Sequence, residues 1–484
     1  MGINIRDANH STFNYKEKFK KVKSILDNWS FRGISLIGKV TVIKSLALSQ
    51  LIHLFSVLLI DDNMIKELKE IFFDFIWGSK SHKIATDTLC NSYSYGGLKM
   101  INVELFIKSI RFAWVHKMFD NHNFSPWKLM LQSTINKFGG NCIFYLGKTS
   151  LSRIAKRIKN PFWSQILLNW AELELNSDFE NLTHILSQPL WHNDLLKAGN
   201  KTLNRPKLKE AGILTISDII DHQFGIPMTE IELNDFDDSI NFLNYQSIIR
   251  SIPEGWKLKI LFSAPINLNQ YRMTTIQKFR RSEKPSRFIY QLIMEKNVNV
   301  CNSQNKWEEK DWFEKNRNWT DIFEMPFLTT KETKIISFQY NLVHRAIFTN
   351  TKLVKAKLIT GPVRCSFCNI DDETIEHLFY FCPVTRSLYL QIMEHLKKKG
   401  LWPNNLNMNP CDILFGFKLS DTTRIVINYI FLYAKYFIHV AKCKNENVLS
   451  ITSFLNYIRH KIQLEKISLS DQNFVEKWGG YENI

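Results

Sequence analysis

The chain of 484 residues carries 63 Lys and Arg against 46 Asp and Glu, a formal net charge of +17, and 45% of its residues are hydrophobic. This composition excludes an intrinsically disordered protein and allows two to four domains with substantial cores. The excess of bases favours a polyanionic partner.

The sequence contains no signal for export or for membrane insertion. Its first ten residues are polar and lack an apolar core followed by a small-residue cleavage site, so no signal peptide is predicted. The longest apolar run, Leu46–Ile60, is interrupted by polar residues and is shorter than the roughly 20 residues that a bilayer requires. We therefore expect no membrane partner and an intracellular protein, cytoplasmic or nuclear and not secreted, with reduced cysteines.

Three amphipathic helices are predicted in the first hundred residues. Apolar side chains recur at helical spacing over Tyr15–Trp29. Ser35 is expected to cap a second helix, and Asp61 or Asp62 a third helix that ends before Gly78. Short connections between such helices predict a compact bundle over residues 1–95.

Longer helical regions follow, and the fold class is predicted to be mainly α in a multi-domain protein. Residues 96–290 form a helical connecting region that begins with a helix near residues 103–119 and contains an acidic surface loop at Glu230–Asp238. An exposed joint at Lys284–Ser286 precedes a C-terminal domain over residues 291–484, which includes an apolar helix at Ile425–Val440. Few segments show the period-two pattern of strands.

A compact array of metal-binding residue types lies in this last domain. Cys365, Cys368, His377 and Cys382 follow the spacing C-x2-C-x8-H-x4-C. Three thiolates and one imidazole are the ligand set of a tetrahedral structural Zn²⁺, with no position left for a substrate. The alternative is a group of ordinary buried thiols beside a histidine. We favour a CCHC zinc knuckle in a module at about residues 330–400, because three cysteines and a histidine fall within 18 residues.

The surroundings of the array allow two further predictions. Asp371 and Asp372 are expected to cap a short helix that carries Glu373 and Glu376 in its first turn, and Pro383 is expected to stop it. His377 would then lie inside this helix and Cys382 at its end. The remaining cysteines are predicted to be reduced core thiols: Cys90, Cys142, Cys301, Cys411 and Cys443.

Basic residues cluster next to the array. The segment Thr333–Ile370 contains six bases and no acid. A second cluster at Lys278–Arg287 holds five bases, and either cluster could also be a solvated helix face or, near the zinc, balance its negative charge. Phe367 and Phe379 are read as core residues of the knuckle in preference to platforms for bases. The candidate nucleic-acid ligands are Lys39, Lys44, Arg345, Lys352, Lys355, Lys357 and Arg364.

Several motifs resemble one family of polymerases. The segment ILDNWSFRGISLIGKVTVIKSL resembles the W..R.LSL.GR...IK signature that follows the palm in reverse transcriptases of non-LTR, LINE-type retrotransposons. The resemblance continues through FDFIWGSK, YGGLKMIN, PLWHND and LKEAGILTISDII, and through ISFQYNLVHRAIFTNTKL into the cysteine array. It implies a thumb over residues 1–95, a wrist-like region over 96–290, and the zinc-bearing C-terminal domain, with the palm preceding Met1.

This resemblance implies binding of RNA and of RNA/DNA template-primer, largely independent of sequence, by a fragment of a polymerase. The family carries out RNA-directed DNA synthesis with two metal-binding aspartates of a palm turn, and no such turn occurs here. The acid pairs at Asp61, Asp237 and Asp371 are read as caps and surface charge, so we expect no enzyme activity. The alternatives are a zinc-stabilised helical scaffold for protein partners, an inert relic of a transposable element, or a nuclease or polymerase acting in trans.

Overall fold

The computed structural model describes residues 3, 10–78, 83–120, 122, 124–175, 178–403, 406–418, 422–446 and 448–479. The predicted fold class is confirmed, because the described residues are mainly helical and their strands are two residues long. Met1 and Gly2, the first residues of the predicted thumb, lie outside this range. Among the described helices, none combines the length and apolar character needed to cross a membrane.

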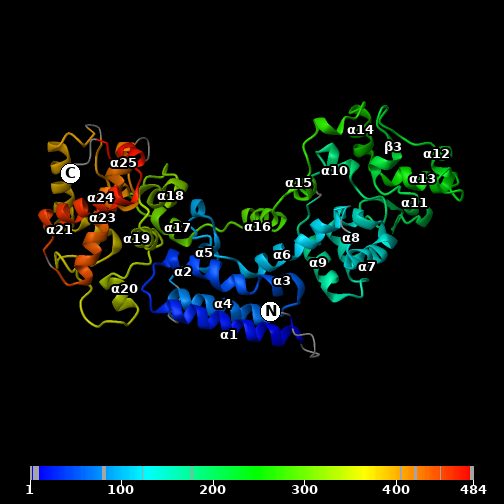
Figure 1. Cartoon of the computed structure of the whole chain (residues 1–484). Helices are drawn as coiled ribbons and strands as arrows, with labels where there is room; N and C mark the ends of the chain where they lie inside the picture. Colours follow the sequence, from blue (N-terminus) through cyan, green and yellow to red (C-terminus); the bar gives the residue numbers. More distant parts are fainter. Residues whose placement is uncertain are drawn as a thin grey trace. The chain divides into compact units, whose positions relative to one another are not determined.

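The chain divides into two compact units, each assembled from separated segments (Figure 1). The first unit comprises Met1–Tyr15, Leu51–Ile65 and Val103–Asn297. The second comprises Lys16–Gln50, Lys66–Asn102 and Val298–Ile484. The division into domains at residues 95 and 290 stays a prediction.

The first unit is built from short helices and two small hairpins. Its α-helices are α3 (Ile52–Val57), α6 (Val103–Met118), α7 (Pro126–Ile135), α8 (Lys148–Ala155), α9 (Pro161–Ala171), α10 (Leu182–Leu186), α11 (Pro206–Glu210), α12 (Glu230–Asn234), α13 (Phe242–Ser251), α14 (Glu254–Phe262), α15 (Thr275–Arg281) and α16 (Pro285–Lys296). Its 3-10 turns are η4 (Asn136–Phe138), η5 (Gly140–Tyr145), η6 (Ile216–Ile219) and η7 (Leu268–Gln270). Its strands are β1 (Lys197–Ala198), β2 (Lys201–Thr202), β3 (Ile220–Asp221) and β4 (Ile226–Pro227), which pair antiparallel as β1 with β2 and β3 with β4.

Helix α6 organises one of the two cores of this unit. Helix α16 packs along it (Figure 1), and Phe112 meets Trp170 edge to face with ring centroids 5.3 Å apart. The buried Arg111 guanidinium donates to the backbone oxygens of Phe55 and Leu58, at 3.1 and 2.7 Å, and so holds α3 against α6. The other core gathers around the buried Trp191.

Two predictions for this unit require correction. The acidic segment Glu230–Asp238 is not simply a loop, because α12 occupies its first half. Thr229 and Glu232 form a reciprocal capping box there, which satisfies the first amides of the helix. The predicted joint at Lys284–Ser286 contains the start of α16, where Pro285 occupies the first turn without loss of a helical hydrogen bond.

The second unit contains most of the N-terminal helices and all helices after residue 298. Helices α1 (His10–Ser30) and α4 (Asp62–Trp77) each contribute residues to both units. The other α-helices are α2 (Leu36–Val42), α5 (Thr86–Cys90), α17 (Asn302–Glu308), α18 (Trp319–Thr329), α19 (Thr333–Val343), α20 (Asn350–Lys355), α21 (Pro383–Lys398), α22 (Pro410–Phe415), α23 (Thr422–Cys443), α24 (Ile451–Ser468) and α25 (Asp471–Trp478). The π-helices are η1 (Ile43–Ala47) and η8 (His377–Phe381), and the 3-10 turns are η2 (Leu48–Gln50) and η3 (Tyr93–Tyr95).

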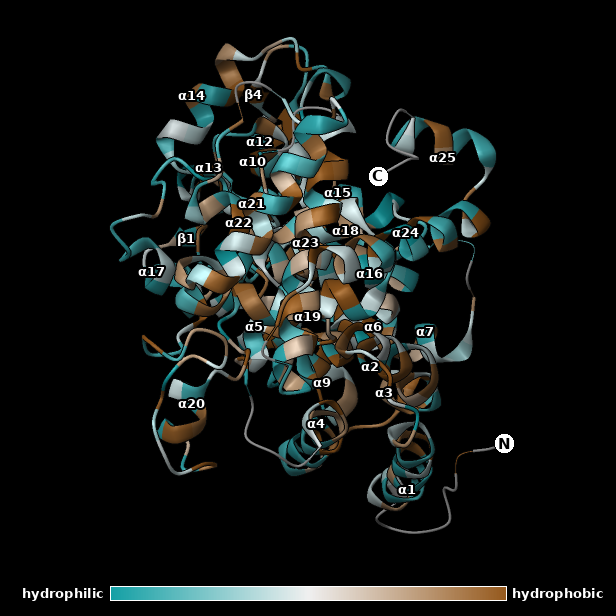
Figure 2. Ribbon diagram, turned by 90° about the vertical axis from the view of Figure 1, so that its left-hand side faces the viewer, coloured by the Kyte–Doolittle hydropathy of each residue, from teal (hydrophilic) through white to brown (hydrophobic). Residues whose placement is uncertain are grey.

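The predicted N-terminal helices are observed with their caps. Helices α1 and α4 each carry both hydrophilic and hydrophobic residues, as expected of amphipathic helices (Figure 2). The Ser35 side chain accepts from the Gly38 amide at 3.2 Å, and Asp61 Oδ1 accepts from the Met64 amide at 2.8 Å. The second helix is interrupted, however, because the π-helix η1 replaces its continuation after Val42.

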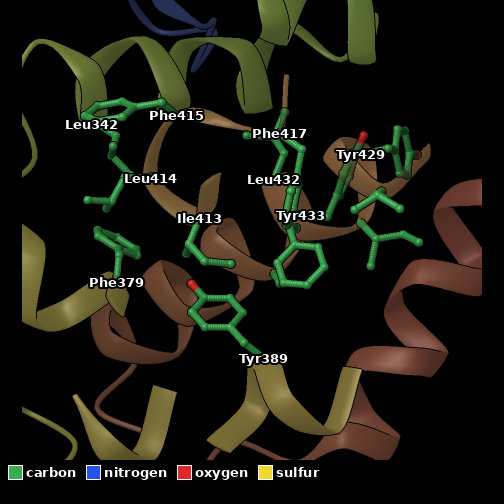
Figure 3. Packing of buried hydrophobic residues seen from close by; sticks show 14 of the residues in the cluster. Leu342, Phe379, Tyr389, Ile413, Leu414, Phe415, Phe417, Tyr429, Leu432 and Tyr433 are labelled. Atoms are coloured by element: carbon green, nitrogen blue, oxygen red, sulfur yellow. The ribbon is translucent and has the colours of Figure 1, made fainter. Parts of the chain in front are cut away.

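A large apolar core fills the second unit and includes residues next to the cysteine array. Helix α23 is buried along most of its length, and Tyr389, Phe415 and Phe417 pack around it with Leu414 (Figure 3). The buried Lys435 ammonium donates to Gln339 Oε1 and to the Leu414 backbone oxygen, at 2.7 and 2.9 Å. Ile375, Leu378 and Phe379 belong to this core, so the segment that carries the metal-binding residues is packed directly on it.

Candidate metal centre

The structure brings the four predicted ligands together. The ligand atoms of Cys365, Cys368, His377 and Cys382 all lie within 4.8 Å of one another, and Cys368 is the least buried of the four. The Sγ atoms of Cys365 and Cys382 are 3.8 Å apart. A tetrahedral zinc ion with bonds of about 2.3 Å to sulfur places two thiolates about 3.8 Å apart, so this spacing fits zinc.

A tight turn presents the first two cysteines. The Cys365 amide donates to the Asp371 backbone oxygen at 2.8 Å, and the Asn369 amide donates to the Cys365 backbone oxygen at 3.0 Å. Asn369 has a φ of 55°, a left-handed conformation that asparagine tolerates better than most residues. The Ile370 amide points at Cys368 Sγ from 3.5 Å, a contact that stabilises negative charge on the sulfur.

The other two ligands flank the π-helix η8. His377 is its first residue and Cys382 follows its last, as predicted, and the Cys382 amide donates to the His377 oxygen at 2.7 Å. This bond spans five residues, one more than in an α-helix, and widens the turn between the two ligands. Pro383 then occupies the first turn of α21, so the chain continues into a new helix directly after the last thiol.

The predicted cap of this helical turn is wrong. Thr374, not Asp371 or Asp372, accepts the His377 amide at 3.0 Å through its hydroxyl. Asp372 instead forms a β-bridge with Arg364, and their side chains pair at 3.8 Å. The helical turn begins at Ile375, after Thr374, so Glu373 precedes it and does not lie in its first turn.

The imidazole of His377 is oriented for coordination through one nitrogen. Nε2 lies 3.2 Å from Cys368 Sγ and therefore faces the thiols. Nδ1 lies 3.6 Å from Asp371 Oδ2 on the opposite side of the ring. A carboxylate at this position is a common orienting partner of a zinc-bound histidine.

One of the two paired sulfurs, that of Cys382, loses its proton more readily than an ordinary thiol. The Cys365 thiol donates to Cys382, which lowers the pKa of Cys382 to about 7 even though burial opposes the shift. The same hydrogen bond, together with burial, raises the pKa of Cys365. Zinc binds thiolates, so a thiol that ionises near neutral pH favours metal capture.

A buried carboxylate holds the array to the rest of the unit, and the sequence analysis missed this role. Glu373 is fully buried and accepts hydrogen bonds from the Asn350 amide at 2.8 Å and from the Ser366 amide at 2.9 Å. It also forms an ion pair with Lys442 of α23. Burial would raise the pKa of Glu373, but hydrogen bonds from Lys442 and Ser366 outweigh it and lower the pKa. Glu373 thus joins α20, the cysteine turn and α23.

A second acid, Glu376, neutralises one of the predicted nucleic-acid ligands. Its carboxylate lies 2.9 Å from the Arg345 guanidinium and 3.6 Å from the Lys310 ammonium. Arg345 also stacks on the Trp307 ring, 4.1 Å from its centroid. Nothing in the sequence distinguishes this internally paired arginine from an exposed one.

The remaining candidate bases near the array differ in exposure. Lys355 and Lys357 are exposed at the end of α20, and Arg364 is 53% exposed beside the cysteine turn. Lys352 is half-buried, and burial together with the nearby Arg345 lowers its pKa to about 8. Because Arg364 is paired with Asp372, the exposed Lys355 and Lys357 are the cations best placed to meet a phosphate.

The two N-terminal candidates donate to backbone oxygens inside their own unit. Lys39 Nζ donates to Phe75 and Ile76 at 2.8 and 2.9 Å, at the end of α4, and burial lowers its pKa. Lys44 Nζ donates to the Lys99 oxygen at 3.2 Å, and burial and the Lys99 charge lower its pKa.

The alternative readings of the aromatic and cysteine residues are settled in part. Phe379 is fully buried against Phe338, with ring centroids 5.9 Å apart, and Phe367 packs on the same core.

Of the five other cysteines, Cys443 is exposed, contrary to the prediction, because it lies at the end of α23 beyond the buried face. Cys90, Cys301 and Cys411 are buried and Cys142 is partly buried.

Comparison with known proteins points to the same segment. Residues 286–389 match the model of a family described as zinc-binding in reverse transcriptase. A putative ribonuclease H protein from Arabidopsis thaliana is 28% identical over 142 residues, which are 27% of this chain and 22% of that relative. The chain therefore contains a region similar to the zinc-binding region of reverse transcriptases, and it spans about a fifth of the relative it matches.

The arrangement as a whole suits a structural metal ion. Four protein ligands would fill a tetrahedral coordination sphere, and two buried carboxylates anchor the segment that carries them. A zinc ion here would hold the cysteine turn, η8 and the start of α21 together. Nothing in this geometry offers an open metal position to a substrate.

Proposed function

We propose that the chain is part of a non-LTR retrotransposon reverse transcriptase and binds RNA and template-primer nucleic acid around a structural zinc module. The proposal includes no polymerase activity of the chain itself, because the chain has no paired palm aspartates. The observation that carries it is the closed Cys365, Cys368, His377 and Cys382 centre within a segment that matches the family described as zinc-binding in reverse transcriptase.

The charge around this centre supports a nucleic-acid partner. Lys355 ends α20, Lys357 lies two residues beyond it, and both are exposed. Glu373 accepts from the Asn350 and Ser366 amides and so fixes α20 to the cysteine turn. Contacts from such bases to phosphates release counterions and do not read sequence, so binding would be salt-dependent and largely independent of sequence.

The test is the double variant Lys355→Glu, Lys357→Glu. Each lost phosphate contact removes about 0.7 from the salt dependence of log K on a single strand, so the slope should fall by about 1.4. Fluorescence anisotropy with a labelled single-stranded RNA between low and moderate salt measures this slope, and zinc content confirms that the variant is folded.

Lys397→Glu, Lys398→Glu is the matched control, because it changes the charge equally at the far end of α21. These lysines are exposed and about 22 Å along the helix from Cys382. Equal loss of affinity in both double variants would mean that net charge, and not the position of Lys355 and Lys357, determines RNA binding. Absence of RNA binding by the parent at low salt would refute the proposal and favour a scaffold for protein partners.

A further inference from the structure

A second candidate site lies in the first unit, away from all residues of the metal centre in sequence. An open pocket of about 640 Å³ forms where the end of α6 meets the segment from η7 to the end of α15. Its lining includes Lys117, Phe119, Tyr271, Arg280 and Arg281. The volume is in the range of pockets that hold small-molecule ligands.

The charge of the pocket favours an anion. Lys117, Arg280 and Arg281 supply three formal positive charges, whereas Asp120 is the acid among the lining residues. The bases come from the last turns of two helices, α6 and α15. Lys117 and Arg281 are exposed, and the Lys117 ammonium also lies 4.6 Å from the centroid of the Trp114 ring.

Contacts with neighbouring residues hold Arg280 in the wall of the pocket. The Arg280 guanidinium lies 4.9 Å from the centroid of the Phe119 ring and 3.3 Å from the Tyr145 hydroxyl. The His116 ring bonds to the Arg280 backbone oxygen at 3.1 Å and thereby ties α15 to α6. The half-buried Tyr271 lines the same pocket, and aromatic rings of this kind are the side chains on which bases stack.

We propose that this pocket binds one nucleotide, with its phosphate on Lys117 and Arg281 and its base against Tyr271. The proposal rests on the proposed function and deepens it, because it adds a second contact with a nucleic-acid strand. The nucleotide is either free or part of a single strand. A base inside a duplex is stacked between its neighbours and does not reach such a pocket.

The experiment uses the full-length chain with zinc and three probes: uridine monophosphate, inorganic phosphate and a short labelled oligouridine. Arg281→Ala and Tyr271→Ala should each weaken binding of the monophosphate or the oligouridine by about fivefold or more. Arg287→Ala is the matched control, because Arg287 is exposed in the same basic cluster but does not line the pocket.

Each outcome decides a part of the proposal. Binding of the monophosphate supports a free nucleotide, and binding of the oligouridine alone supports a strand. Inorganic phosphate that competes as well as the monophosphate would overturn the proposal, because a simple anion site needs no ring. Equal effects of Arg281→Ala and Arg287→Ala, or no binding of any probe, would also overturn it. If Lys355→Glu, Lys357→Glu still weakens RNA binding in that case, the proposed function stands and only the pocket is excluded.

Discussion

At the residue scale, the metal centre is predictable from residue type and spacing, but its supports are not. Thiols and an imidazole concentrated within 18 residues have few structural explanations other than a metal, so Cys365 and its partners were expected to meet. Glu373 and Glu376 looked like first-turn acids of a helix. Their burial depends on Lys442 and Arg345, whose positions only the folded chain reveals.

The ion pair between Glu373 and Lys442 predicts that a conservative substitution of Glu373 lowers the stability of the fold strongly. Glu373→Gln leaves the nearly buried Lys442 without its counter-charge, and breaking such a pair costs about 3–5 kcal/mol. Urea unfolding monitored by tryptophan fluorescence measures the change. Glu446→Gln is the control, because its pair with Lys444 is exposed and should contribute less than about 1 kcal/mol. Similar values for the two variants would show that Glu373 is no anchor.

Charge was less informative than spacing at this scale. Lys39 and Lys44 were selected as phosphate ligands because they are basic and lie in the predicted N-terminal bundle, and Arg345 because it lies in the basic segment beside the cysteine array. A sequence gives the number of cations in a segment but not the direction of each side chain. In the fold these three donate to backbone oxygens or to Glu376, whereas Lys355 and Lys357 remain exposed.

At the scale of elements, periodicity located the long helices well and the irregular ones poorly. The helices near Tyr15–Trp29 and Ile425–Val440 were expected, and both extend a few residues beyond these bounds. The π-helices η1 and η8 were not, because a π-turn needs one extra residue per turn and leaves little mark on a hydrophobic pattern. At η8 the extra residue belongs to the spacing between His377 and Cys382.

We expect Lys39 to cap the end of helix α4 and not to bind a phosphate. Its ammonium satisfies two terminal oxygens of α4, where a cation also opposes the negative end of the helix dipole. Lys39→Met should therefore lower the free energy of unfolding by about 1–2 kcal/mol and leave RNA affinity unchanged. Lys20→Met on the exposed face of α1 is the control for lost charge. Normal stability with reduced RNA affinity would restore Lys39 as a phosphate ligand.

Asp194 links α8 to the segment after Trp191 and gives a pH-dependent contribution. It accepts from Ser150 Oγ at 2.9 Å and from Arg153 at 2.8 Å. Burial would raise its pKa, but the Arg153 and Ser150 hydrogen bonds outweigh it and hold the pKa below that of an ordinary aspartate. The carboxylate therefore stabilises the fold above its unfolded pKa, and this stabilisation is lost as pH falls through the folded pKa.

Asp194→Asn tests this link. The variant should unfold at lower urea than the parent at pH 7, by about 1–2 kcal/mol, and the difference should shrink below about pH 4. Urea midpoints across this range measure it. A difference that persists or grows at acid pH would mean that the loss comes from packing and not from the charge.

At the scale of the whole molecule, the net charge does not show that acidic and basic residues are concentrated in different segments. The chain has a net charge of +17, yet residues 211–249 contain seven acids and neither Lys nor Arg. The bases concentrate elsewhere, in Thr333–Ile370 beside the metal centre and in Lys278–Arg287 beside the proposed nucleotide pocket. Composition predicted a polyanionic partner, and only the fold shows which bases share an accessible surface.

The division of the chain into units was the least predictable feature. Breaks in a sequence pattern suggest boundaries between consecutive segments, but both units here combine segments from the first hundred residues with later ones. Such non-local association leaves no signal in composition or periodicity. The mainly α fold class followed from helical periodicity, which is local, and it is confirmed.

The most direct test of this account is the metal content of the purified chain. We predict one zinc per chain, with three sulfur and one nitrogen ligands by X-ray absorption spectroscopy. Cys368→Ser should lose the metal, whereas Cys443→Ser should retain it because Cys443 is exposed and outside the array. A parent chain without zinc, or a Cys368→Ser variant that retains the full amount, would contradict the structural zinc centre.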